Sequence, residues 1–468
     1  MKKTQVSIDT LNRTLPMISP VNFPKILEEN VGNFCPICGK TIFSNLLEID
    51  GKVYLEKNCC AQGLIHLEND VDFFKKHRNH TEIEPLVSNP KNFQEWSHQK
   101  PNYCTTAIFL YITARCNQNC PICYLKFNNY LNRKDLDMSS GQIKKIVKKY
   151  HSREIILLGG EPTIREDLPE IIKIIKKSGN NPAICTNGLK LGDKNYVKKL
   201  KMAGLRDIAL QFDGFNQTAN VKFRGQDYLE KKLKALENIK KVGGFRVILA
   251  AVIERGVNET EITKIIQFAL KNNIDFVKFI GLTPPEKDKL KTTTLSDLIK
   301  VMEKNGYFDK EYYLELVKMY RNLQNYIRKT VKGSMLEDWV LKRTMGDFNA
   351  VFFKKERVPR LLFQKNEIKR INEILIKATS KKNKIASFLS LLNNSAELVK
   401  SPLGILAKEE FLISKKISNS DKLFRVDLGG NVEVKDRLLN APRKSIVISL
   451  FSMASGGALS ELFATLPD

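Results

Sequence analysis

Between residues 107 and 282 the chain alternates short apolar runs with segments whose apolar residues recur at helical spacing. Six of the runs predict strands, at 107–113, 154–162, 182–188, 207–214, 245–253 and 275–282. The segments between them predict helices at about 139–151, 166–179, 194–203, 227–242 and 258–272. This alternation predicts a parallel sheet with right-handed crossovers. Six units indicate an open, three-quarter barrel, whose chemistry is expected at the carboxyl ends of the strands.

Two further parts flank this core. The first hundred residues contain a ribbon-like module at about 31–68, and the residues from 286 onward form an α+β cap. The predicted fold is therefore α/β: a partial (β/α)6 TIM-type barrel at 101–285, a small N-terminal metal-ribbon module and a mostly helical C-terminal cap at 286–468.

Three segments of the cap have clear patterns. Residues 307–331 place apolar and aromatic side chains on one helical stripe, which we interpret as core rather than as a lipid groove. Residues 423–438 predict a hairpin with a GGN turn. The uncharged tract at 445–460 predicts a buried strand and turn rather than a membrane-surface segment.

Charge changes the picture less than its size suggests. The chain has 77 Lys and Arg against 51 Asp and Glu, a formal net charge of +26. We favour lysine-rich, solvated helix faces as the explanation. The alternative is a positive field that attracts an anionic substrate, nucleic acid or a membrane surface. No RNA-recognition or zinc-finger pattern supports nucleic acid. With no secretory leader and no bilayer-spanning run, we expect a cytoplasmic protein, with membrane association left open.

All nine cysteines lie in the first 185 residues, which favours metal binding in a reducing compartment over disulfides. The first group has a C-P-x-C knuckle followed by an adjacent pair, with zinc or iron as the candidate metal. Its predicted ligands are Cys35, Cys38, Cys59 and Cys60. Because neighbouring side chains point apart, one of the pair could give way to His66. The alternative is a hairpin with buried thiols.

The second group is the C-x3-C-x2-C stretch formed by Cys116, Cys120 and Cys123. Three thiolates around one loop can hold a four-iron cluster and leave one iron open for a substrate or cofactor. The alternative is three thiols that happen to be close. Context favours the cluster, because glycine-rich or polar motifs follow four of the other predicted strands. These motifs are Gly159–Pro162, Thr186–Gly188, Gln211–Gly214 and Ile280–Leu282.

The stretches CNQNCPIC, with the following Tyr124, and LLGGEPTIREDL at 157–168 resemble the radical S-adenosylmethionine (SAM) superfamily. The resemblance covers about 104–285. It implies a [4Fe–4S] cluster on the three cysteines, SAM chelated to the open iron, and a 5′-deoxyadenosyl radical that abstracts hydrogen from the substrate. It also implies a reductant such as ferredoxin or flavodoxin.

The resemblance implies contacts to SAM as well. Gly159, Gly160, Glu161 and Pro162 would bind the amino group, and Asn187 the ribose or carboxylate. Ile280 and its neighbours would face adenine. The residue before the last cysteine is often aromatic in the superfamily and is Ile122 here, for which Tyr124 would compensate.

A finer resemblance involves DGKVYLEK, LQFDG and FRGQDYLEKKLKALENIKKVGG, which are similar to the archaeal tetraether lipid synthases and related pterin methylases. It implies a transferase or C–C bond-forming enzyme acting on a hydrophobic or lipid-like substrate, or on a reduced pterin. The chain departs from that group at Cys59–Gly63, which reads CCAQG, and keeps only Cys104 of the auxiliary cysteines. Two alternatives remain: a radical SAM enzyme that modifies a peptide or small metabolite, and a degenerate iron–sulfur or metal-binding protein.

Overall fold

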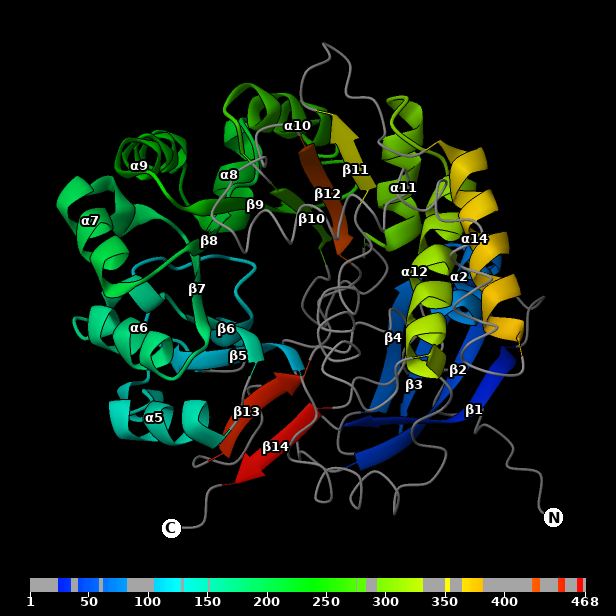
Figure 1. The fold of residues 1–468 in the computed structure, drawn as a ribbon, viewed down its shortest axis with the longest axis horizontal. Coiled ribbons are helices and arrows are strands. Elements are labelled where there is room, and N and C mark those ends of the chain that lie inside the picture. Colours follow the sequence, from blue (N-terminus) through cyan, green and yellow to red (C-terminus); the bar gives the residue numbers. More distant parts are fainter. Residues whose placement is uncertain are drawn as a thin grey trace.

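Two β-sheets organise the chain (Figure 1). The computed structural model describes residues 24–34, 41–58, 62–81, 105–127, 130–149, 152–274, 276–282, 293–330, 350–353, 364–381, 423–429, 445–450 and 461–465. Within these residues one sheet has four strands in the order β1-β2-β3-β4. The other has ten, in the order β11-β12-β10-β9-β8-β7-β6-β5-β13-β14.

The centre of the larger sheet consists of six parallel strands in chain order. They are β5 (Thr105–Thr113), β6 (Ser152–Gly159), β7 (Asn181–Thr186), β8 (Asp207–Gln211), β9 (Arg246–Ile253) and β10 (Phe276–Gly281). Adjacent members pair in parallel throughout. The predicted partial barrel is confirmed, and among the described residues the two ends of the sheet, β11 and β14, do not pair with each other.

Helices connect these strands and cover the sheet from outside (Figure 1). They are α5 (Ser140–Lys149), α6 (Leu168–Lys177), α7 (Lys194–Ala203), α8 (Gln217–Arg224), α9 (Leu229–Val242) and α10 (Glu261–Lys271). All were predicted except α8. Its N-cap is Asn216, whose side chain accepts a hydrogen bond from the Ala219 amide, and its C-cap is Gly225, with a φ of 78°. These are ordinary start and stop signals, although its apolar face is short.

Local sequence explains the position of the remaining helices. In α6, Ile171, Ile172 and Ile175 form the buried stripe against the sheet. In α7, the Asp193 side chain caps the first turn and Gly204, with a φ of 106°, ends the helix. Fully buried strand residues such as Leu157 and Leu249 complete the same core.

The C-terminal strands lie at both edges of the six-strand sheet. Strand β12 (Leu423–Gly429) pairs in parallel with β10 and antiparallel with β11 (Ala350–Phe353). Strand β13 (Ser445–Leu450) pairs antiparallel with β5 and with β14 (Glu461–Thr465). Of the hairpin predicted at 423–438, the first part forms β12, whose neighbours are β10 and β11, and residues 430–438 lie outside the described residues. A strand at the start of 445–460 is confirmed.

The smaller sheet is antiparallel and lies beside a helical layer. Its strands are β1 (Lys25–Phe34), β2 (Thr41–Ile49), β3 (Lys52–Asn58) and β4 (Gln62–Glu68), followed by α2 (Val71–Thr81). The helical layer is α11 (Leu295–Lys304), α12 (Lys310–Thr330) and α14 (Lys365–Ser380).

Polar and aromatic contacts attach the smaller sheet to this layer. Asn69 Nδ2 donates to Asp297 Oδ2 at 2.6 Å, and the Ser296 hydroxyl donates to the buried Glu68 carboxylate. The aromatic stripe of α12 is core, as predicted, with Tyr312, Leu316 and Val317 among its buried residues.

His77 of α2 is buried, and its ring centroid lies 5.4 Å from that of Phe73 and 5.9 Å from that of Tyr313. No described helix is both long enough and apolar enough to cross a bilayer.

Candidate active site

The three cysteines of the C-x3-C-x2-C stretch lie in the loop between the end of β5 and the short helix α4 (Tyr124–Phe127). Cys116, Cys120 and Cys123 are partly exposed and form no disulfide. The loop folds back on itself, since the Cys123 amide donates to Cys120 O at 3.1 Å. The Cys116 amide donates to Asn132 Oδ1 at 2.9 Å. The backbone thus brings all three thiols to one side of the barrel mouth.

Two N–H groups approach the Cys116 sulfur. The Gln118 amide donates to Cys116 Sγ at 3.4 Å, and Asn187 Nδ2 lies 4.0 Å from the same sulfur. Burial, with the nearby Glu161 and the other two cysteines, raises the pKa of the Cys116 thiol to about 12. Burial also raises the pKa of Cys120, against the opposing charge of Arg224. The Cys116 and Cys120 thiols therefore hold their protons more tightly than free cysteine, and metal binding must displace those protons.

The two glycines of the GGEP motif hold β6 against the cysteine loop. The Gly160 amide donates to Thr113 O and the Glu161 amide to Arg115 O, both at 2.8 Å. A Cβ added to Gly159 would lie 2.0 Å from Thr113 O, and one added to Gly160 would lie 2.1 Å from Arg115 O. These glycines thus allow the end of β6 to lie directly against the backbone that leads from β5 into the cysteine loop.

Glu161 is 1% exposed and accepts four hydrogen bonds. The donors are Thr163 N at 3.0 Å, Thr163 Oγ1 at 2.6 Å, Thr186 Oγ1 at 2.7 Å and Asn187 N at 2.7 Å. Burial raises the pKa of this carboxyl, and the four donors oppose the rise. Glu161 therefore fixes the turn after β7, and Asn187 Nδ2 in turn donates to Asn117 Oδ1 of the cysteine loop at 2.8 Å.

A buried charged group lies beside Cys120, and two of its members, Arg224 and Lys232, were not singled out from the sequence. Asp213, at the end of β8, accepts from Arg224 Nε at 2.7 Å and from Nη2 at 2.9 Å. The Arg224 guanidinium also lies within electrostatic reach of Cys120 and lowers the pKa of its thiol against the effect of burial. Lys232 of α9 donates to Gln211 Oε1 at 2.6 Å. In the sequence, this group could have been found from Lys232, a lysine that lies on the apolar stripe of α9 formed by Leu229, Leu236 and Ile239.

The other predicted site residues are placed as follows. Ile280, half-buried near the end of β10, lies in register with Val252 on one side and Gly429 on the other. Pro162 is buried in the turn after Glu161. Tyr124 is the first residue of α4. Ile122 packs with the apolar cluster of Ala219, Phe223 and Leu282.

The predicted N-terminal metal ligands lie outside the described residues, and so does Cys104. These ligands are Cys35, Cys38, Cys59 and Cys60.

The thiols can be tested for their fit to an iron–sulfur cluster. Gln118 is buried in the loop, and within the part of the chain that the structure describes its Nε2 has no hydrogen-bond partner. Its Oε1 accepts from the Cys120 thiol at 3.4 Å. Cluster sulfurs accept N–H donors, and such bonds tune the cluster. An unused donor among three thiols therefore fits a sulfur-rich group.

A single ion fits less well. No three described His, Cys, Asp or Glu side chains lie close enough together to hold one metal ion. A four-iron cluster is wider than one ion and is held at its corners by separate thiolates.

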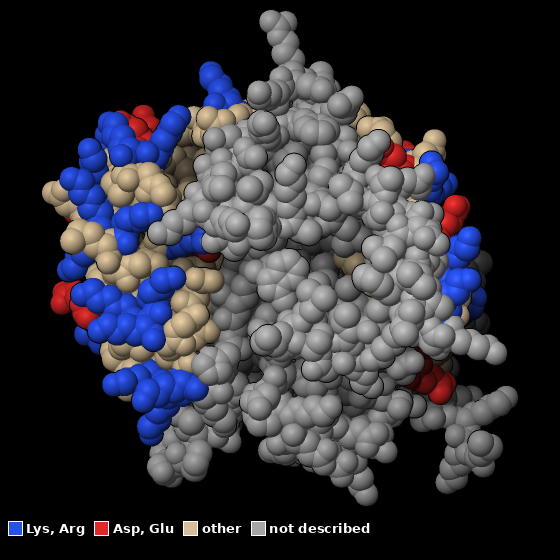
Figure 2. All heavy atoms as spheres, viewed as in Figure 1, with Lys and Arg blue, Asp and Glu red and all other residues tan. Residues whose placement is uncertain are grey.

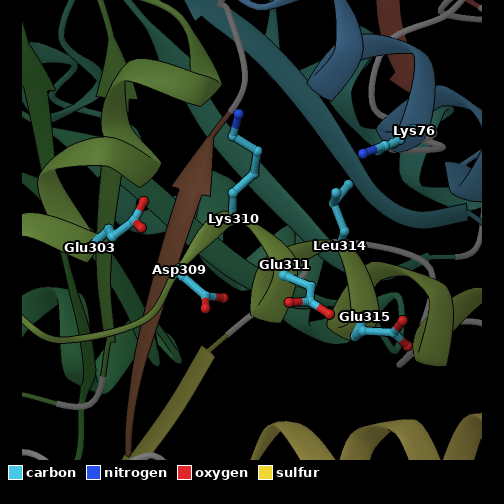
Figure 3. A pocket seen from close by; sticks show the side chains of 7 residues that line it. All are labelled: Lys76, Glu303, Asp309, Lys310, Glu311, Leu314 and Glu315. Carbon is cyan, nitrogen blue, oxygen red and sulfur yellow. The ribbon is translucent and has the colours of Figure 1, made fainter.

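A charged hollow of about 630 Å³ lies elsewhere, between α2 and α12 (Figure 3). Its lining includes Lys76, Glu303, Lys310 and Glu315 and no cysteine. Lys310 pairs with Asp70, and Lys365 bridges Asp309 and Glu311 at its rim. Its charges are thus largely paired within the protein.

Comparison with known proteins agrees with this geometry. Residues 110–269 match the family model of the radical SAM superfamily. The chain is 36% identical over 299 residues to the 7,8-dihydro-6-hydroxymethylpterin dimethyltransferase of Methanocaldococcus jannaschii, covering 59% of this chain and 58% of that protein. It is 33% identical over 199 residues to the GTP 3′,8-cyclase of Clostridium perfringens, covering 41% of this chain and 60% of that protein. The chain thus spans about three fifths of the length of these curated relatives.

Among solved structures, that of Streptococcus suis SuiB bound to S-adenosylmethionine aligns with 60% of this chain and 69% of its own, at 18% identity and a TM-score of 0.37. The cysteine loop, the GGEP turn and the family match coincide in one stretch of sequence. Residues 110–269 are therefore a radical SAM domain.

Proposed function

We propose that this protein is an enzyme that uses SAM and a [4Fe–4S] cluster on Cys116, Cys120 and Cys123 to abstract hydrogen from a carbon of its substrate. The supporting observation is that β5, β6 and β7 present the cysteine loop, the GGEP turn and Asn187 at one edge, joined by direct hydrogen bonds. When bound and reduced, the cluster and SAM would supply a 5′-deoxyadenosyl radical.

The chain's own residues would hold these groups in place. Glu161, Asn187 and the backbone of Gly159 to Pro162 would bind the SAM amino group and ribose or carboxylate, with Glu161 acting through the Asn187 turn that it fixes. Ile280 and Tyr124 would flank adenine. Arg224, placed between Asp213 and Cys120, would favour the thiolate that ligates iron.

For the reaction we propose C–C bond formation or methylation, in a transferase whose substrate is hydrophobic or lipid-like. The motifs from DGKVYLEK to KVGG support this choice. A second candidate is a reduced pterin, favoured by the printed activity of the Methanocaldococcus relative and its 36% identity over 299 residues. The N-terminal cysteines would hold zinc or iron outside the radical chemistry.

We propose the cytoplasm as the place of action and an acidic electron carrier such as ferredoxin or flavodoxin as the reductant. Lysines cover the outer faces of α5, α6, α7 and α9 (Figure 2). The exposed ones are Lys144, Lys145, Lys148, Lys173, Lys176, Lys177, Lys194, Lys198, Lys199, Lys231, Lys234, Lys240 and Lys241. Glu170, Glu230 and Glu237 are the acidic residues of the same helices. Such a face attracts an acidic protein or an anionic lipid surface.

The decisive experiment is anaerobic reconstitution followed by counts of iron, sulfide and zinc per chain. Dithionite and SAM are then added, and 5′-deoxyadenosine is measured. We expect about four cluster irons and 5′-deoxyadenosine in the wild type, and neither in Cys120→Ala. Cys185→Ala, which removes a thiol of β7 outside the C-x3-C-x2-C stretch, is the matched control and should keep both. A Cys120→Ala protein with a full cluster and SAM cleavage would reject the ligand assignment.

Substrate classes are separated in a second assay. The reconstituted enzyme is given archaeal-type lipid extract, a reduced pterin or a peptide library, and product is sought by mass spectrometry. Consumption of lipid supports the first proposal and methylation of the pterin supports the second. Modification of a peptide alone would refute both. SAM binding without cleavage under every condition would indicate a degenerate binding protein.

A further inference from the structure

Lys232 is a buried lysine that lies outside the cysteine loop and the GGEP turn. Only 3% of its surface is exposed, and it lies on the face of α9 that packs against the barrel. Lysine is seldom fully buried unless it is paired. Here its ammonium donates to an amide oxygen, Gln211 Oε1, at 2.6 Å. Burial lowers the pKa of Lys232 to about 8, while Asp213 opposes that shift.

Gln211 links Lys232 to Asp213 through its two side-chain polar atoms. Its Oε1 faces the Lys232 ammonium and its Nε2 donates to Asp213 Oδ2. Because the ammonium can only donate and the carboxylate can only accept, the amide has a single orientation. Asp213 in turn holds Arg224 through two hydrogen bonds, and its Oδ1 also accepts from Val252 N at 2.9 Å. The series ends at Arg224, whose charge acts on Cys120.

The series also carries charge. Lys232 and Arg224 are cationic and Asp213 is anionic, so the buried group has a net charge of +1 beside Cys120. Asp213 is 1% exposed, and the Arg224 side chain is 11% exposed, so water screens these charges weakly. Two carboxylates lie outside this group: Asp227, held by Asn220 and within electrostatic reach of Lys232, and Glu161, within electrostatic reach of Cys116. The charges of the protein around an iron–sulfur cluster set its reduction potential.

We propose that Lys232 is a positioning residue that raises the reduction potential of a cluster held by Cys120. It does so by orienting Gln211 and Asp213, which hold Arg224 beside Cys120, and by adding its own positive charge near the cluster. A positive charge near the cluster favours the more negative, reduced form over the oxidised one. This inference rests on the proposed function, because it requires the cluster on Cys116, Cys120 and Cys123.

The test is an EPR-monitored redox titration of reconstituted protein, with mediator dyes and dithionite as the source of the electron. Lys232→Met keeps most of the side-chain volume and removes the charge and the donor. We expect its midpoint to shift to more negative potential, with the cluster content unchanged. Lys234→Met is the control, because that lysine lies on the same helix with its side chain 56% exposed. Its midpoint should equal that of the wild type.

Two further variants separate charge from positioning. Lys232→Arg keeps the charge and should restore most of the wild-type midpoint, whereas Lys232→Gln keeps a donor without the charge and should fall between wild type and Lys232→Met. Lys232→Gln also replaces Lys232→Met in the test if the latter does not fold.

Each outcome has a distinct meaning. A full cluster with a wild-type midpoint in Lys232→Met, or in Lys232→Gln where it is used instead, would overturn this inference alone. Wild-type protein that takes up no cluster would overturn the proposed function, and this inference with it.

Discussion

At the scale of single residues, Glu161 joins the two halves of the candidate site. Its carboxylate accepts from Thr163 on its own turn and from Thr186 and Asn187 on the next strand. We expect Glu161→Gln to lower the free energy of unfolding by about 2–4 kcal/mol, because the new NH2 group faces donors and leaves them unsatisfied. Chemical denaturation of the apoprotein measures this loss.

Thr186→Val provides the matched control for Glu161. It keeps the shape of the side chain and removes one of the four donors, so the expected loss is about 1 kcal/mol. Equal stability of Glu161→Gln and wild type would contradict the anchoring role. SAM binding, measured on reconstituted protein, should fall more in Glu161→Gln than in Thr186→Val.

The buried charge of Lys232 predicts a pH dependence of stability. Its pKa is lowered from 10.5 to about 8 in the folded chain, so the unfolded chain binds more protons between these values. The penalty for burying the charge is full below pH 8 and disappears as pH rises toward 10.5. In the apoprotein, the stability of wild type relative to Lys232→Met should therefore rise by up to about 3 kcal/mol across this range. If the stability difference between wild type and Lys232→Met did not change with pH, the pKa of Lys232 would not be lowered in the folded chain.

The sequence predicted these residues unequally. The cysteine spacing and GGEP are local patterns, and the structure joins them at one edge. The internal role of Glu161 depends on Thr186 and Asn187, 25 and 26 residues away, and no local pattern indicates it. Arg224 and Lys232 escaped notice because a lysine or arginine on a helix is usually solvated. Only the apolar residues around Lys232 hinted that it is buried.

At the scale of elements, the closest contact in the site is between β6 and the cysteine loop. Gly160 has no room for a Cβ, since the obstacle is backbone: Arg115 O at 2.1 Å and Ala114 O at 2.8 Å. We expect Gly160→Ala to push the loop away from β6 and to abolish cluster assembly, measured as iron and sulfide per chain. Gly141→Ala, where the nearest atom is Ser139 Oγ at 3.8 Å, should assemble a normal cluster. Full assembly in Gly160→Ala would mean that this contact is dispensable.

The elements also show where sequence reasoning succeeds. The six core strands have strong apolar runs separated by amphipathic helices, and all six were predicted. The strand at 423–429 was predicted from alternation and a following GGN turn, which are local signals, but its pairing partners in the large sheet were not. Its actual neighbours, β10 and β11, come from residues 276–281 and 350–353, and such long-range pairing leaves no mark in a short window.

At the scale of the whole molecule, the lysine face of α5, α6, α7 and α9 predicts a salt-sensitive encounter with an acidic electron carrier (Figure 2). The double variant Lys198→Glu, Lys199→Glu should slow cluster reduction by reduced flavodoxin or ferredoxin. Its reduction rate should also fall less with added salt than that of the wild type. Reduction by dithionite in the same variant should be unchanged, which controls for damage to the cluster.

The opposite result would have a clear meaning for this face. An unchanged rate with the protein donor would exclude these lysines from its docking. Binding of the wild type, and not of the double variant, to anionic but not neutral vesicles would instead assign the face to a lipid surface.

The coverage of the sheet edges has a consequence for how the protein is made. Strand β5 ends at residue 113, and its edge partner β13 begins only at residue 445. At ~5–20 residues per second, the ribosome needs roughly 20–70 s to supply that partner. Until then a nascent chain with a formed core displays an unpaired edge, the part of a sheet most prone to join another chain. The growing polypeptide, rather than the folded protein, is thus the form most exposed to edge-to-edge association.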